Sequence, residues 1–218
     1  MHFFKGALTK YSRASLVAPD WDNNLANIFL LILSELDDQT AYLFYQSFLS
    51  QAIKDNNIEL AEYILERTNK CNYDDLVNAV STENLNMVNL IFKYDHNSVS
   101  FINQSSSFRG SPLFIAVEIN NIEMVKTFLS IPKINLNYAL NGKTILVYSL
   151  NNDKFEIAKL LIQDERTDIN ICHNEDSPLV IAAKKRKTDI ISLLINNPKF
   201  DERANLLDYA FYISNNEI

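Results

Sequence analysis

Glycine is scarce in this chain: its 218 residues include 3 glycines and 5 prolines, whereas average usage predicts about 15 glycines. So few glycines disfavour turn-rich β architectures and the glycine-rich loops that hold phosphates and dinucleotides. Long apolar runs are missing too, since the longest purely aliphatic or aromatic run, 28–33, is far too short to span a bilayer. The first residues, 1–5, lack the pattern of a signal peptide. We therefore expect no membrane insertion.

Cysteine and histidine are also rare, with 2 and 3 residues. Cys71 and Cys172 lie far apart in the sequence and offer neither a disulfide framework nor the spacing of metal ligands, which favours a reducing, intracellular compartment. Acidic residues outnumber basic ones by 27 to 20, for a net charge of −7. This balance argues against nucleic-acid binding, because phosphate neutralisation needs a basic face.

The sequence repeats itself. Three equivalent triplets occur at intervals of 33 and 33 residues: Ser111-Pro112-Leu113, Thr144-Ile145-Leu146 and Ser177-Pro178-Leu179. Relative to the leucine of each triplet (offset 0), apolar residues recur at offsets +3, +9, +12, +15 and +16, and two upstream units follow the same pattern from Leu49 and Leu76. Apolar residues fill 28 of these 30 positions, where the 47% hydrophobic fraction predicts about 14.

Each unit predicts a pair of helices. Offsets 0 and +3 share one face of a first helix, and offsets +9 to +16 form the stripe of a second. The joins between the two helices fall at polar pairs: Asn120-Asn121, Asn152-Asp153 and Arg186-Lys187. Ser111, Thr144 and Ser177 are suited to cap the first helix. One such hairpin cannot bury its own stripe but stacked neighbours can, which predicts an all-α solenoid.

The five units are 27, 37, 33 and 33 residues apart. Loops accept insertions more easily than helices do, so we place the extra residues of the 37-residue interval in a loop, the Ser- and Asn-rich stretch 97–109. Deleting 99–103 should then leave the helical content almost unchanged.

The unit resembles the ankyrin repeat. The Ser/Thr-Pro-Leu opening, small residues such as Ala116 and Ala182 in the first helix, and a second helix of Val-x-x-Leu-Leu type are similar to that family. The likeness covers about 46–218, in a divergent, Asn-rich form similar to ankyrin sets of unicellular eukaryotes with AT-rich genomes. Tetratricopeptide arrays, with units of about 34 residues, are the nearest alternative, but the Ser/Thr-Pro opening and the short helices favour ankyrin.

The resemblance implies an all-α ankyrin-type solenoid of helical hairpins with an N-terminal helical cap. The cap is expected over 1–45 and the array over 46–218, with units near 46–72, 73–96, 111–143, 144–176, 177–204 and a partial one at 205–218. This chain departs from the family at three positions. The family's turn glycine survives only as Gly142, and Arg109 and Glu175 are its counterparts in the neighbouring repeats. Phe114, Val147 and Val180 replace the family's histidine, and Asn120, Asp153 and Arg186 replace its glycine between the helices.

Catalytic and metal chemistry have little support. His173 follows Cys172 near Glu175 and Asp176, but no second histidine is placed to join them. Adjacent carboxylates such as Asp74-Asp75 are better explained as helix starts, where negative charge is favourable. The run 184–187 (Lys-Lys-Arg-Lys) is the one basic cluster; it fits a nuclear-import signal, a contact with an acidic partner, or a solvated surface.

The resemblance implies a non-catalytic scaffold that binds a protein partner on the concave surface of the stack, without a cofactor, metal, nucleic acid or small-molecule substrate. By the family's pattern, the partner-binding positions are Phe108, Glu118, Ile119, Leu140, Asn141, Lys143, Asn151, Asn152, His173, Asn174, Asp176, Lys184 and Lys185. We expect an intracellular, cytoplasmic protein, with nuclear import through 184–187 as an alternative. Two other functions stay open: a targeting module of a larger effector or enzyme whose catalytic part lies beyond Ile218, and a self-associating array.

Overall fold

The computed structural model describes residues 38–94, 99–105, 110–171 and 176–203. The chain divides into two compact units, 1–46 and 47–218. In the first unit the described residues are 38–46, which belong to helix α3 (Asp38–Lys54). The rest of the expected N-terminal cap lies outside the described residues.

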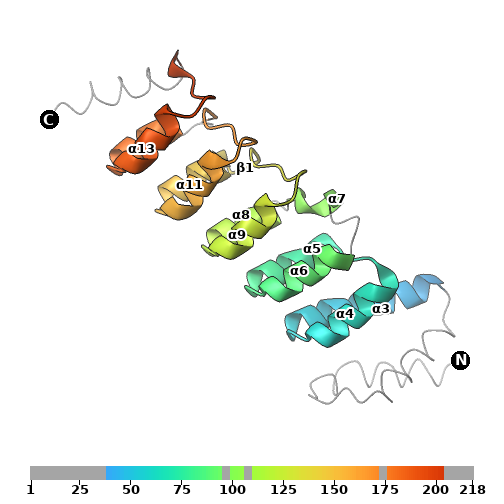
Figure 1. Cartoon of the computed structure of the whole chain (residues 1–218). Coiled ribbons are helices and arrows are strands. Elements are labelled where there is room, and N and C mark those ends of the chain that lie inside the picture. Colours follow the sequence, from blue (N-terminus) through green and yellow to red (C-terminus); the bar gives the residue numbers. More distant parts are fainter. Residues whose placement is uncertain (1–37, 95–98, 106–109, 172–175, 204–218) are drawn as a thin grey trace, which may run out of the picture. The chain divides into compact units, whose positions relative to one another are not determined.

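The second unit is a stack of helical hairpins. Its helices and strands are α4 (Ile58–Thr68), α5 (Tyr73–Ser81), α6 (Leu85–Tyr94), α7 (Val99–Ile102), α8 (Pro112–Glu118), α9 (Ile122–Leu129), β1 (Ala139–Leu140), β2 (Lys143–Thr144), α10 (Ile145–Asn151), α11 (Phe155–Gln163), α12 (Pro178–Lys184) and α13 (Thr188–Ile195). Helices pair as α5/α6, α8/α9, α10/α11 and α12/α13, and each pair stands beside the next in single file (Figure 1). This arrangement confirms the all-α repeat solenoid, with one short antiparallel hairpin, β1–β2, in the described part of the chain.

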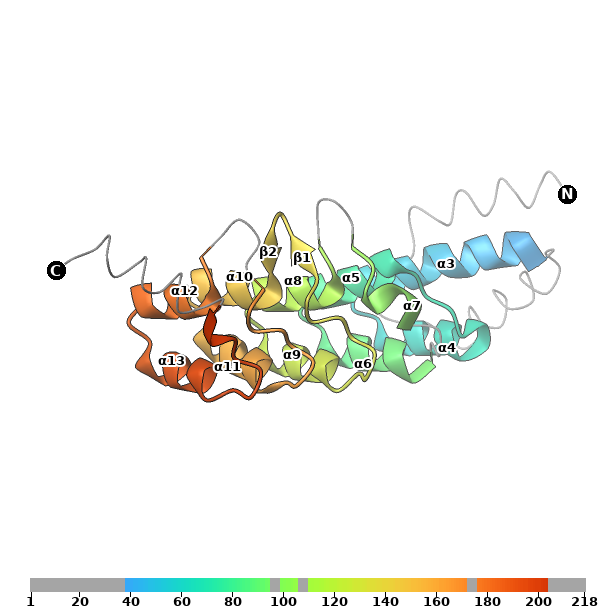
Figure 2. The ribbon, with the colours of Figure 1, turned by 90° about the horizontal axis from the view of Figure 1, so that it is seen from above.

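Two rows of helices run along the stack. The first helices α5, α8, α10 and α12 form one row, and the second helices α4, α6, α9, α11 and α13 form the other (Figure 2). Within the first row α8 packs against both α5 and α10, and α10 packs against α12. Equivalent positions of successive repeats therefore lie next to one another, which is what allows a row of side chains to act together.

The repeated columns make the core. The side chains at offsets 0, +3 and +15 are buried in all five units, and those at +12 are buried in four. Offset +9 is instead half-buried in four units and exposed at Thr188, because it is the first residue of each second helix. A further buried column at offset +11 was not predicted: Leu60, Met87, Met124, Ile157 and Ile190.

The joins keep the backbone geometry of glycine without using glycine. In every unit the residue at offset +7 has a left-handed backbone, with φ between 56° and 61°: Asn56, Glu83, Asn120, Asp153 and Arg186. The next N–H then donates to the carbonyl at offset +3, over 2.8–3.2 Å, which satisfies the end of the first helix. Asparagine tolerates this conformation better than other non-glycine residues do, so Glu83 and Arg186 are the strained members of the set.

The predicted caps are present. Ser111, Thr144 and Ser177 are almost fully buried, and each hydroxyl accepts a hydrogen bond from the N–H three residues later. Pro112 and Pro178 occupy the first helical position, where a missing N–H is harmless. The Ser or Thr cap therefore fixes where the first helices α8, α10 and α12 begin.

A ladder of asparagines joins the loops that follow the second helices. Asn137 donates to the carbonyl of Arg166 (3.0 Å) and accepts from the N–H of Asp168 (2.8 Å). Asn103 and Asn170 make the same pair of bonds to the backbone of the next loop. Each side-chain amide thus bonds to one carbonyl and one N–H of the next loop, as a neighbouring backbone would, and links two successive repeats.

One expectation about the long interval was wrong. The stretch 97–109 is not a simple loop, because residues 99–102 form helix α7. Phe101 and Ile102 are buried, and Asn103 begins the asparagine ladder. Deleting 99–103 would therefore remove core side chains and one rung of the ladder.

Candidate functional site

Six of the residues expected to bind a partner lie at equivalent positions on adjacent first helices. Glu118 and Ile119 end α8, Asn151 and Asn152 end α10, and Lys184 and Lys185 end α12. Since these helices pack in a row, their ends form one continuous surface. We call this surface, together with the β1–β2 hairpin, the first-helix face.

The hairpin adds a second part to this face. Figure 2 shows it rising from the row of first helices, on the side away from the second helices. Leu140 pairs with Lys143 across it, and Asn141 and Gly142 form its tip with φ of 52° and 76°. Two left-handed residues in a row favour the tight two-residue turn that matches the twist of a hairpin, so the Asn-Gly sequence explains why strands form here.

The remaining expected residues are divided between the described and undescribed parts of the chain. Asp176 is exposed just before α12 and pairs with Lys184. Phe108, His173 and Asn174 lie outside the described residues, and so does Cys172.

Tyr148 belongs to this face, although the sequence did not single it out. Its half-buried ring lies on α10 and packs against the ring of Phe114 on α8, with centroids 4.6 Å apart. Burial, and next the negative charge of Glu118, raise the pKa of the Tyr148 phenol above its ordinary value. The one sequence signal for this position is that the fourth unit has an aromatic residue at offset +2, where the other units have none.

Glu118 and Ile119 are the residues of the first-helix face whose side chains are most available to a partner. Glu118 is exposed and has no ion pair with any residue in the described ranges, while Ile119 is half-buried at the end of α8. Beside them, the hydroxyl of Tyr148 has no hydrogen-bond partner in those same ranges. An unpaired carboxylate, an aliphatic side chain and an aromatic ring with a free hydroxyl are the elements of a protein-binding surface.

The basic run 184–187 is mostly engaged inside the molecule. Lys184 pairs with Asp176, and the Nζ atom of Lys185 lies 2.7 Å from Oδ1 of Asp153. Lys187 lies over the ring of Phe155, with Nζ 4.0 Å from its centroid. These contacts lower the positive charge that the run offers to an acidic partner or an import receptor. Nuclear import through this run stays a prediction that the structure does not test.

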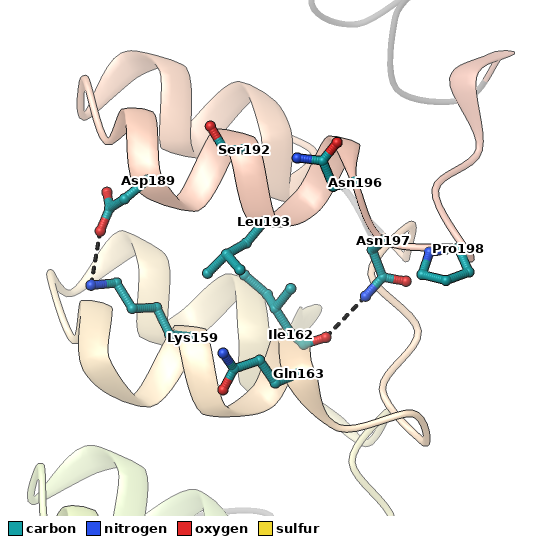
Figure 3. Close-up of a pocket in the computed structure, with 9 residues that line it drawn as sticks. All are labelled: Lys159, Ile162, Gln163, Asp189, Ser192, Leu193, Asn196, Asn197 and Pro198. Carbon is teal, nitrogen blue, oxygen red and sulfur yellow. Dashed lines mark hydrogen bonds and ion pairs between the residues drawn. The ribbon is translucent and has the colours of Figure 1, made fainter.

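A separate pocket of about 570 Å³ lies between α11 and α13, on the row of second helices (Figure 3). Its two charged side chains, Lys159 and Asp189, pair with each other at 2.8 Å. That contact, followed by the bond to Glu156, raises the pKa of Lys159. Asn197 closes one end by donating to the carbonyl of Ile162. With its charges matched, the pocket provides no group suited to acid–base chemistry.

The described ranges hold neither a candidate metal cluster nor a candidate membrane-spanning helix. No three His, Cys, Asp or Glu side chains of the described residues come together in a way that could hold a metal ion. Among those residues, no helix is long and apolar enough to cross a membrane.

Comparison with known proteins identifies the repeat. Residues 76–171 match the family model for ankyrin repeats (3 copies). A search of curated proteins found no match. The matched region begins inside α5 and extends past α11, and so includes Glu118, Ile119, Tyr148 and the β1–β2 hairpin.

Proposed function

Because this chain is an ankyrin-repeat protein, we propose that it is a non-catalytic scaffold that binds a protein partner on its first-helix face. Ankyrin repeats are generally protein–protein interaction modules, and they are typically not catalytic. An intracellular location is part of this proposal, on the grounds of cysteine usage given above.

The observation that carries the proposal is the cluster of Glu118, Ile119 and Tyr148 on adjacent helices. The ring of Tyr148 is already held against Phe114, so little side-chain freedom is lost when a partner covers it. Tyrosine is also among the residues that contribute most to binding energy at interfaces. We expect Tyr148 to be the centre of the contact and the polar ends of α10 and α12 to be its rim.

The face can distinguish partners by charge. Glu118 at the end of α8 is negative, whereas Lys184 and Lys185 at the end of α12 are positive. The positive end is compensated by Asp176 and Asp153, and the negative end has no such compensation in the described residues. We therefore propose that the partner places a basic or hydrogen-bonding group near Glu118 and an apolar group over Ile119.

The test passes a displayed library of cytosolic protein fragments over the immobilised chain and selects the fragments that bind. The Kd of each selected fragment is then measured for the unmodified chain and for its variants. Tyr148→Ala should weaken binding at least about tenfold, or roughly 1.4 kcal/mol. Glu118→Lys should weaken it as well. Glu123→Lys is the matched control, because Glu123 is an exposed glutamate of the same repeat on the second helix α9.

The control should leave the Kd almost unchanged, and thermal melting of each variant shows that it is folded. Fragments that bind Tyr148→Ala and Glu118→Lys as tightly as the unmodified chain, but lose affinity for Glu123→Lys, would show that the binding surface lies on the second helices.

A further inference from the structure

The tip of the β1–β2 hairpin differs in sequence from the other turns with left-handed residues in the described ranges. Of the three glycines, only Gly142 follows an asparagine. At the helix joins the chain uses Asn, Asp, Glu or Arg for left-handed backbone, but at this tip it uses Asn141 followed by Gly142. This sequence is the best former of a two-residue hairpin turn, and it is also the one in which an asparagine amide is least protected from its own backbone.

Asn141 can lose its side-chain amide in an intramolecular reaction. The backbone nitrogen of Gly142 attacks Cγ of the Asn141 side chain, a C–N bond forms to close a five-membered succinimide, and ammonia leaves. Water then opens the ring at either carbonyl, giving aspartate or isoaspartate. The sum of the two steps consumes one water and releases one ammonia, with no oxidant, metal or enzyme. A side chain on the following residue hinders the attack, and glycine has none.

The surroundings of the tip leave this attack open. Asn141 is exposed, and apart from Gly142 and its two chain neighbours no heavy atom of the described residues lies within 4 Å of the place where a Cβ of Gly142 would stand. The hairpin consists of only two residue pairs, Ala139 with Thr144 and Leu140 with Lys143. Hairpins this short are marginal by themselves and open locally, so Asn141 can reach the geometry of ring closure while Thr144 stays buried as a helix cap.

Two neighbouring asparagines lack these properties and serve as internal controls. Asn137 is held by hydrogen bonds from both ends of its amide to the next loop, and it precedes the bulky Tyr138. The Oδ1 atom of Asn135 accepts a hydrogen bond from the N–H of Asn137 at 3.0 Å, and Leu136, which follows it, is buried.

We propose that Asn141 is a site of spontaneous deamidation, which converts the hairpin tip to a mixture of aspartate and isoaspartate as the protein ages. The product carries one more negative charge. In the isoaspartate form the main chain also has one extra carbon at the turn, which disturbs the pairing of Leu140 with Lys143. The proposal does not depend on what the protein binds.

The experiment incubates the intact chain at neutral pH and physiological temperature, and compares it with freshly purified protein. Trypsin cuts after Lys133 and Lys143, so Asn135, Asn137 and Asn141 fall in one peptide, 134–143. Tandem mass spectrometry then assigns the mass shift from amide to carboxylate to one position, and methylation by an isoaspartyl methyltransferase reports the isoaspartate form.

The expected result is a mass shift that accumulates at Asn141 and is absent from Asn135 and Asn137. Gly142→Asn is the matched variant, because asparagine tolerates the left-handed backbone but adds a Cβ; it should suppress the shift. A synthetic peptide of residues 134–143, incubated in parallel, reports the reaction without the fold. A folded chain that stays unmodified while the peptide deamidates would overturn the proposal, as would equal modification of all three asparagines.

Discussion

Lys185 of the fifth repeat reaches back to Asp153 of the fourth. Its Nζ atom lies 2.7 Å from Oδ1 of Asp153 and 3.1 Å from the carbonyl oxygen of Asn151. The ammonium group thus satisfies both an acidic side chain and the end of helix α10, whose carbonyls carry partial negative charge. A residue expected to contact a partner therefore also holds two repeats together, and its substitution would change both functions at once.

For this reason, the variants that test binding should avoid Lys185 and use side chains that form no ion pair or hydrogen bond within the described residues. Glu118 and Ile119 meet that condition best on the first-helix face. The predictions below concern the stack first and the face afterwards.

Phe128→Ala should lower the free energy of unfolding by about 3–5 kcal/mol, because it leaves a cavity in a packed core. Phe128 is fully buried on α9, and the ring of Phe92 meets it edge-on with centroids 5.6 Å apart. Urea unfolding followed by circular dichroism measures the change. A loss below about 1 kcal/mol would contradict the assignment of offset +15 to the core.

Replacing the strained join residues with glycine should stabilise the chain. Glu83 and Arg186 have φ of 56°, a conformation that costs a residue with a Cβ roughly 1–2 kcal/mol. Glycine avoids this cost but loses more conformational entropy on folding. Glu83→Gly and Arg186→Gly should therefore each raise the free energy of unfolding by about 1 kcal/mol. The measurement is again urea unfolding.

Ser81→Gly is the control for this pair, because Ser81 is an exposed residue of helix α5. Glycine there should destabilise the chain, because Ser81 has ordinary helical backbone and glycine loses more conformational freedom on folding than serine does. If Glu83→Gly destabilised the chain as much as Ser81→Gly does, the left-handed backbone at the join would be refuted.

The titration of Tyr148 tests the geometry of the binding face. Since burial and Glu118 raise the pKa of this phenol in the folded chain, the unfolded state loses its proton first. The corresponding stability is fully present below the ordinary tyrosine pKa of about 10 and is lost as the pH rises through the folded value. Glu118→Gln removes the negative charge and should lower the Tyr148 pKa, as measured by NMR of a ring-labelled tyrosine. Glu123→Gln should leave the pKa of Tyr148 unchanged. If the two variants changed this pKa equally, the claim that Glu118 lies close to Tyr148 would be contradicted.

Local rules were sufficient to predict the repeats. The spacing of apolar residues placed the helix pairs, and Ser111, Thr144 and Ser177 gave their starting points, because capping and helical periodicity depend on neighbours within a few residues. The joins between the helices of these three repeats also lie where the sequence placed them, and their left-handed residues are the ones that replace the family's glycine. Asparagine at Asn120 explains one of them by residue preference, while Arg186 shows that the stack can impose the geometry.

Features that depend on distant residues were missed. Helix α7 is a single turn in a polar stretch, and it is stable because Phe101 and Ile102 are buried by the neighbouring repeats. The asparagine ladder was missed because an asparagine can end a helix, cap one or bridge two loops, and only the next repeat decides which. Tyr148 was missed because its ring partner and its charged neighbour both come from the preceding repeat.

The most direct test of the account is hydrogen–deuterium exchange of the full chain, free and bound to a partner selected by its affinity. The account predicts new protection in the ends of α8 and α10 and at the β1–β2 hairpin, with α9 and α11 exchanging as they do in the free chain. Protection confined to α9 and α11 would contradict it.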